Sequence, residues 1–67
     1  MKEVDARGLS CPEPIMLTAQ ALKKESGAIK VLVSEPVQVT NVQKYAQSQG
    51  KKVTSAEKDG HFELTIE

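Results

Sequence analysis

One face of a helix is the clearest signal along this chain. Apolar residues recur at intervals of three and four between residues 12 and 25, as they do along the buried side of an amphipathic helix. The members of this stripe are Ile15, Ala19 and Leu22, with Met16 widening it. Lys23 and Lys24 follow in the last turn, where cations complement the helix dipole, and Gly27 can cap the end. The pattern predicts a helix over residues 12–25.

A second helical pattern occupies the middle of the chain. We predict that it begins near Pro36 or Val37, since proline is favoured in a first turn, and that it ends at Gly50. Its predicted core face consists of Val39, Val42, Ala46 and Gln49, with Tyr45 at the margin.

The remaining apolar residues follow the period of β-strands. The predicted strands cover residues 2–6, 29–33, 53–58 and 61–66. In the last of them Phe62, Leu64 and Ile66 alternate onto one face. Asp59-Gly60 precedes this strand and predicts a two-residue hairpin turn of type I′.

The predicted order of elements is therefore β-α-β-α-β-β. Each β-α-β step implies a right-handed crossover, which puts both helices on one face of the sheet. A two-layer α/β sandwich is the economical fold, and 67 residues allow one domain, over residues 1–67.

Composition excludes several classes of function. Nine basic and nine acidic residues balance, and the aromatics are only Tyr45 and Phe62, so we expect no direct nucleic-acid binding. No apolar run reaches the length of a membrane span, and residues 1–5 lack the apolar stretch of a signal peptide. One unpaired cysteine suits a reducing compartment, so we expect a cytoplasmic protein that makes no membrane contact.

That cysteine, Cys11, is the strongest candidate for chemistry. It lies in Ser10-Cys11-Pro12-Glu13-Pro14, at the entrance of the first predicted helix, and it has no second cysteine with which to pair. Most free cysteines are buried and inert. Two prolines in three positions nevertheless fix the backbone beside the thiol, and helix-start loops usually face solvent. We therefore favour a reactive thiol that meets an outside partner.

Two registers are open for the start of this helix. Ser10 can be the N-cap, with Glu13 completing a capping box. Alternatively Cys11 is the N-cap and Pro12 takes the first helical position. The second register agrees better with the extended backbone that a residue before proline prefers.

Opposing effects set the acidity of the Cys11 thiol. The positive end of the helix dipole favours a thiolate. Pro14 has no N–H to donate, and Glu13 adds a negative charge, which Arg7 can compensate if the loop folds back. We predict a modestly activated thiol.

The run Asp5-Ala6-Arg7-Gly8-Leu9-Ser10-Cys11-Pro12-Glu13-Pro14 resembles the signature of the TusA/SirA-like sulfur carriers. The resemblance extends through Lys24 and covers essentially the whole chain, and residues 41–50 look like the N-terminal domain of YedF-type selenium-metabolism proteins. It implies two helices packed on a four-stranded mixed sheet. It also implies that the motif cysteine accepts a persulfide sulfur from a donor protein, of cysteine desulfurase or rhodanese type, and passes it to an acceptor protein.

Carried over residue by residue, the resemblance makes Cys11 the sulfur-carrying nucleophile. Pro12, Glu13 and Pro14 complete its motif, and Arg7 and Gly8 lie in the approach loop. It implies a sulfurtransferase-type carrier that works as a monomer and has no resident cofactor, only a transient persulfide on Cys11.

One alternative remains open at the level of sequence. The protein can be a non-catalytic regulatory or docking module that uses the Cys-Pro-x-Pro loop as a binding surface. A metal site is not expected, because His61 has no second histidine and a site needs three or four ligands.

Overall fold

The computed structural model describes residues 2–10, 13–24 and 27–67, and it has the predicted order of elements. These are β1 (Lys2–Asp5), α1 (Glu13–Lys24), β2 (Ile29–Val33), α2 (Pro36–Ser48), β3 (Val53–Lys58) and β4 (His61–Ile66). The strands form one sheet in the order β1-β2-β4-β3. β1 and β2 are parallel, whereas β4 is antiparallel to both β2 and β3.

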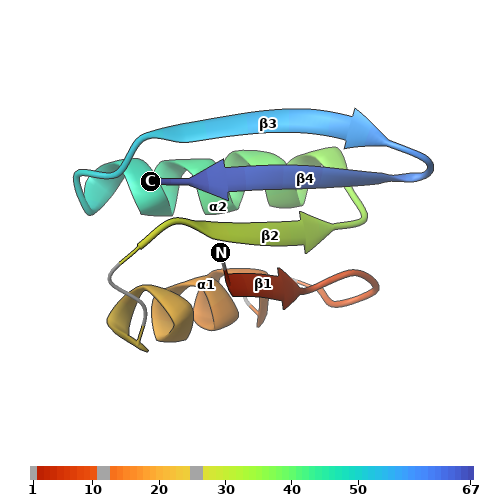
Figure 1. Cartoon of the computed structure of the whole chain (residues 1–67). Coiled ribbons are helices and arrows are strands. Elements are labelled where there is room, and N and C mark those ends of the chain that lie inside the picture. Colours follow the sequence, from red (N-terminus) through yellow and green to blue (C-terminus); the bar gives the residue numbers. More distant parts are fainter. Residues whose placement is uncertain (1, 11–12, 25–26) are drawn as a thin grey trace.

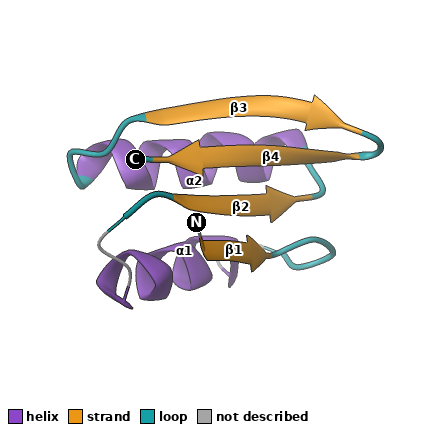
Figure 2. Ribbon diagram, in the orientation of Figure 1, coloured by secondary structure: helices purple, strands orange, loops and turns teal. Residues whose placement is uncertain are grey.

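Both helices lie on the same side of this sheet (Figures 1 and 2), so the molecule has two layers. The predicted two-layer α/β sandwich, with a four-stranded mixed sheet and two helices, is confirmed. Neither α1 nor α2 is long and apolar enough to cross a membrane, and no other helix occurs in the described residues.

The hydrophobic core lies between the sheet and the helices. Alternate residues of the two central strands are completely buried there: Ile29, Val31 and Val33 from β2, with Leu64 and Ile66 from β4. Phe62 packs against this cluster, so the predicted alternation in the last strand is confirmed. β3 is an edge strand that contributes only Val53 to this packing, because its other residues are exposed.

The buried face of α1 differs from the predicted stripe. Pro14, Thr18 and Ala21 are its buried residues, while Ile15, Ala19 and Leu22 are only half-buried and Met16 is 55% exposed. The most buried stripe is therefore displaced by about one residue from the predicted one, although Ile15 and Leu22 still pack against the core. Thr18 tolerates burial because its hydroxyl donates to the Pro14 carbonyl at 2.8 Å, which satisfies a polar group that hydrophobicity alone assigns to the surface.

The predicted face of α2 is right at its centre and wrong at its end. Val42 and Ala46 are completely buried and Val39 packs beside them. Gln49 is exposed, because the helix ends at Ser48 and Gln49 is its C-cap. Gln38 is instead only 2% exposed, a burial that its polar side chain does not predict.

The hairpin between β3 and β4 has the predicted two residues, since Lys58 pairs with His61. Its predicted turn type is wrong. Type I′ requires a positive φ at both central residues, but Gly60 has a φ of 75° and Asp59 does not have a positive φ. A negative followed by a positive φ is the sign pattern of a type II turn.

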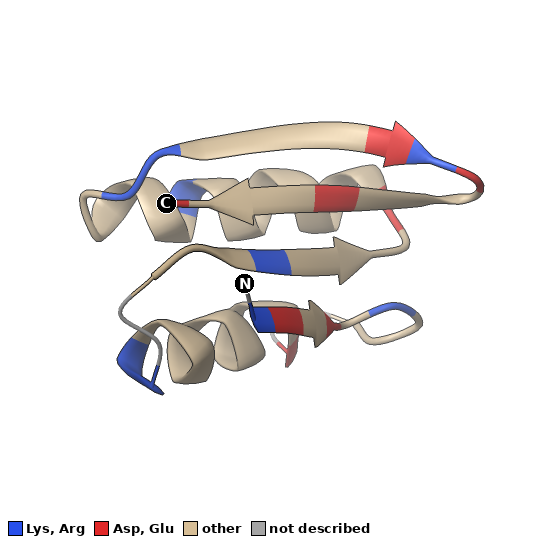
Figure 3. Ribbon diagram, viewed as in Figure 1, with Lys and Arg blue, Asp and Glu red and all other residues tan. Residues whose placement is uncertain are grey.

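Charged positions of both signs lie along the strands (Figure 3). Lys30 of β2 and Glu63 of β4 alternate with buried core residues, so their side chains lie on the face of the sheet opposite the helices. Glu63 lies 3.6 Å from the ammonium of Lys30 and 3.4 Å from His61 Nε2. Burial acts to raise the pKa of Glu63, but the hydrogen bond with His61 and the positive charge of Lys30 outweigh it, so the pKa is lowered.

Candidate functional site after strand β1

The candidate nucleophile follows β1, in the connection to α1. Cys11 and Pro12 lie outside the described residues, and so does the prediction that Cys11 is the N-cap. The residues on either side of them, Ser10 and Glu13, are both exposed. The described part of the site consists of the loop of residues 6–10, which leads to the cysteine, and the first turn of α1.

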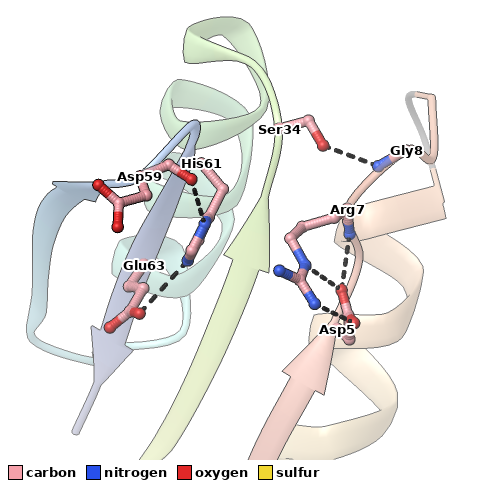
Figure 4. A network of polar contacts seen from close by, with 7 residues as sticks. All are labelled: Asp5, Arg7, Gly8, Ser34, Asp59, His61 and Glu63. Atoms are coloured by element: carbon pink, nitrogen blue, oxygen red, sulfur yellow. Dashed lines mark hydrogen bonds and ion pairs between the residues drawn. The ribbon is translucent and has the colours of Figure 1, made fainter.

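The loop begins with a clamp between Asp5 and Arg7 (Figure 4). The guanidinium donates two hydrogen bonds to the two carboxylate oxygens, from Nε at 2.9 Å and from a terminal nitrogen at 2.8 Å. The backbone N–H of Arg7 donates to the same carboxylate at 3.1 Å. These bonds lower the pKa of Asp5 to about 2, because they stabilise the charged carboxylate.

The clamp also decides what Arg7 does. Its guanidinium is paired with Asp5, two residues away, and this pairing raises the pKa of Arg7. The charge is therefore directed back to the end of β1. The predicted compensation of Glu13 by Arg7 is not formed as an ion pair between these two described residues.

The second attachment of the loop is at Gly8. Its φ of 80° lies in the left-handed region, which glycine adopts without steric cost. Its N–H donates a 2.8 Å hydrogen bond to the hydroxyl of Ser34, the first residue after β2 (Figure 4). Leu9 N–H donates to the Ala6 carbonyl at 3.3 Å, which closes the turn.

No local pattern in the sequence assigns a role to Ser34. The signal that could have found it is topological, because Ser34 directly follows a buried strand parallel to β1. Parallel neighbours end at the same edge of a sheet, so the residue after one strand can bond to the loop after the other. Ser34 and Gly8 are 26 residues apart in the sequence.

The start of α1 is shaped by Glu13 and Pro14. The Glu13 N–H donates to the backbone carbonyl of Ser10 at 2.9 Å, so the capping box with the Ser10 side chain is not formed between these two described residues. The exposed Glu13 carboxylate lies in the first turn, where the helix dipole favours it. Pro14 is completely buried, so this motif residue anchors the helix start in the core.

His61 makes its polar contacts within the hairpin of β3 and β4. Among residues 2–10, 13–24 and 27–67, no three histidine, cysteine, aspartate or glutamate side chains are grouped to bind an ion. His61 contacts the Asp59 carbonyl and Glu63 instead (Figure 4). Hydrogen bonds to Asp5 and to Ser34 hold the loop that precedes Cys11.

Fold and motif together define a small α/β protein that carries one thiol at a helix entrance. A model of the family described as sulfurtransferase TusA matches residues 2–67. The chain therefore belongs to the TusA family, whose members are sulfur carriers that work with partner proteins.

Individual relatives agree with this assignment. The chain is 29% identical over 58 residues to sulfur carrier protein TusA from three strains of Pseudomonas putida, an alignment that covers 84% of this chain and 72% of each relative. It is also similar to the crystal structure of a SirA-like protein from Desulfitobacterium hafniense. That pair has a TM-score of 0.94 and 36% sequence identity, over 98% of this chain and 95% of the other.

Proposed function

We propose that this protein relays a persulfide sulfur on Cys11 between two partner proteins. The observation that carries the proposal is the position of the only cysteine, inside the Cys-Pro-Glu-Pro motif of a chain that belongs to the TusA family. The clamp at Asp5 and the Gly8–Ser34 bond support it, because they fix the loop that leads to the thiol. A thiol presented by a fixed loop loses less entropy when a partner engages it.

The chemistry proposed for Cys11 needs no external oxidant. Its thiolate attacks the outer sulfur of a persulfide on a donor protein, the S–S bond of the donor breaks, and the donor thiolate leaves. One S–S bond forms as another breaks, so Cys11 gains one sulfur atom as a persulfide. In the next step an acceptor thiolate attacks that outer sulfur, and Cys11 leaves as a thiolate.

The absence of a second cysteine in the chain suits this role. A thioredoxin-like protein resolves its mixed disulfide with a neighbouring thiol, but this sequence has only Cys11. A persulfide with no thiol beside it in the chain survives until a partner arrives. The proposed donor is a protein of cysteine desulfurase or rhodanese type. The unpaired thiol supports a relay in a reducing compartment such as the cytoplasm.

A regulatory or docking module is the second candidate. Pro14 is completely buried, so one of the two motif prolines packs in the core and does not bear on thiol chemistry. This burial favours a module without sulfur chemistry. In that case the loop binds a partner and Cys11 takes up no sulfur.

Intact-mass measurement separates the two candidates. We expect wild-type protein incubated with a cysteine desulfurase and cysteine to gain about 32 Da, the mass of one sulfur atom. Cys11→Ser is the matched control and gains nothing. Wild type that gains no mass, or a Cys11→Ser variant that gains as much, contradicts the relay.

A further inference from the structure

A groove of about 280 Å³ runs between β1 and α1, on the helix side of the sheet edge. From α1 it is lined by Leu17, Gln20, Ala21 and Lys24, a single stripe at helical spacing. β1 lines the other side along its whole length, from Lys2 to Asp5. Val4, Leu17 and Ala21 make its floor apolar.

The β1 side of the groove presents backbone as well as side chains. Among the strands of residues 2–10, 13–24 and 27–67, β1 pairs with β2 alone, so it lies at the edge of the sheet. Ala6 N–H donates to the Leu32 carbonyl, and backbone groups alternate in direction along a strand, so the amides of Glu3 and Asp5 point away from β2. Glu3 and Asp5 line the groove. A row of outward N–H and C=O groups therefore lies beside an apolar floor, which is what an added strand needs.

Charge distinguishes the two ends of the groove. β1 and α1 run in opposite directions (Figure 1), so Lys2 and Lys24 lie at the same end, the blue start of β1 and the blue end of α1 in Figure 3. Within the described part of the chain, neither lysine forms an ion pair. At the other end the charge of Asp5 is already neutralised by Arg7. The Glu3 carboxylate offsets one of the two lysine charges, so the lining keeps one net positive charge.

We propose that this groove binds the extended C-terminal tail of a partner protein as an added strand, antiparallel to β1. Only in the antiparallel direction does a C-terminus reach the start of β1, where its carboxylate meets Lys2 and Lys24. An apolar side chain of the tail then covers Val4 and Leu17, and its backbone pairs with Glu3 and Asp5. The tail leads away past Asp5, which is where the loop to Cys11 begins.

This proposal does not depend on sulfur chemistry at Cys11. A protein that takes up no sulfur can still bind a tail, and a working carrier can lack this groove function. Binding and sulfur loading are measured separately, so the failure of one proposal is distinguishable from the failure of the other.

The test uses a fluorescent peptide of alternating threonine and valine with a free C-terminal carboxylate, and the same peptide with an amidated C-terminus. We expect the free acid to bind about tenfold more tightly than the amide, since the amide loses the charge-assisted contact with the lysines. Nuclear magnetic resonance should show the largest amide shifts at Glu3 and Asp5.

Charge variants assign the contact to the two lysines. The double variant Lys2→Glu with Lys24→Glu should remove the preference for the free acid, and the matched control Lys58→Glu, an exposed lysine on the opposite edge strand β3, should keep it. The comparison of the two peptides on unchanged protein remains decisive if the double variant unfolds.

Several outcomes overturn the proposal. They are equal affinity for the two peptides, no binding at about 1 mM peptide, and amide shifts confined to β3. A dimer in sedimentation experiments that the double lysine variant dissociates also overturns it, because the edge of β1 then belongs to a second copy of this chain.

Discussion

Ser34 shows how one hydroxyl connects two parts of the candidate site. It lies immediately after β2, yet its oxygen accepts the N–H of Gly8 in the loop that leads to Cys11. The bond joins the exits of the two parallel strands, β1 and β2. No local pattern in the sequence predicts it, because the partner is 26 residues away.

Ser34→Ala should loosen this loop. We expect the Gly8 amide to exchange its hydrogen about fivefold faster, which corresponds to the loss of about 1 kcal/mol from one hydrogen bond. Ser34→Thr keeps a hydroxyl and should restore protection. Ser55→Ala, at an exposed position of β3, is the control and should change nothing at Gly8. Unchanged exchange in Ser34→Ala would show that the bond does not fix the loop.

The Asp5 carboxyl should keep its charge in acid solution. Its pKa is lowered to about 2 from 3.8 by the hydrogen bonds from Arg7. A lowered folded-state pKa means that the clamp stabilises the loop fully above about pH 3.8 and loses that contribution as the pH falls through about 2.

Titration of the Asp5 carboxyl by nuclear magnetic resonance checks this prediction. We expect a midpoint near 2 in the wild type, and a midpoint near the ordinary 3.8 in Arg7→Met, which removes the guanidinium. A midpoint that stays where it is after Arg7→Met would exclude Arg7 as the cause.

Among the elements, α1 shows best what a pattern can and cannot predict. Its existence and approximate length follow from the period of apolar residues, but its orientation does not. The buried stripe passes through Pro14 and Thr18, and burial of the threonine depends on a hydrogen bond to the Pro14 carbonyl. A count of apolar positions does not identify Thr18 as buried, because it ignores hydrogen bonds that polar side chains make within the helix.

Pro14 therefore packs in the core, a structural role that its place in the motif does not indicate. Pro14→Ala removes two buried ring methylenes and adds freedom to the unfolded chain, so we expect the free energy of unfolding to fall by about 2 kcal/mol. Urea unfolding measures it. Met16→Ala, on the same helix at a side chain that is 55% exposed, should cost less than about 0.5 kcal/mol. Equal effects of the two variants would contradict the packing role of Pro14.

The first turn of α2 also buries a polar residue that the helical period does not predict. Val42 and Ala46 are found from the helical period, whereas the buried Gln38 is not. Its Oε1 has no hydrogen-bond partner in the described structure, which is an unfavourable burial for a polar atom. Sequence patterns assume that polar atoms avoid such positions, so they cannot predict this one.

The topology of the sheet brings the described parts of the candidate site together. β1 and β2 are parallel, so the loop after β1 and the residue Ser34 after β2 meet at one edge of the sheet. The order of elements and the two-layer sandwich could be predicted, because the periods differ clearly between helices and strands. The strand order β1-β2-β4-β3 was not predicted, since periodicity does not specify which strands pair.

The candidate site divides in the same way. Cys11 and its prolines are visible in the sequence because they are contiguous. The Asp5–Arg7 clamp and the Ser34 contact depend on side-chain geometry, and the groove beside β1 depends on how α1 packs. The candidate reactive residues are thus found more easily than the residues that position them.

Transfer of radiolabelled sulfur tests the relay most directly. The protein is incubated with a cysteine desulfurase and labelled cysteine, separated from the donor, and then treated with a dithiol. We expect label on the wild type and none on Cys11→Ser, and we expect the dithiol to release all of it as sulfide, because a persulfide sulfur is reducible. Label that is absent from the wild type, equal on Cys11→Ser, or resistant to the dithiol would contradict a persulfide carried on Cys11.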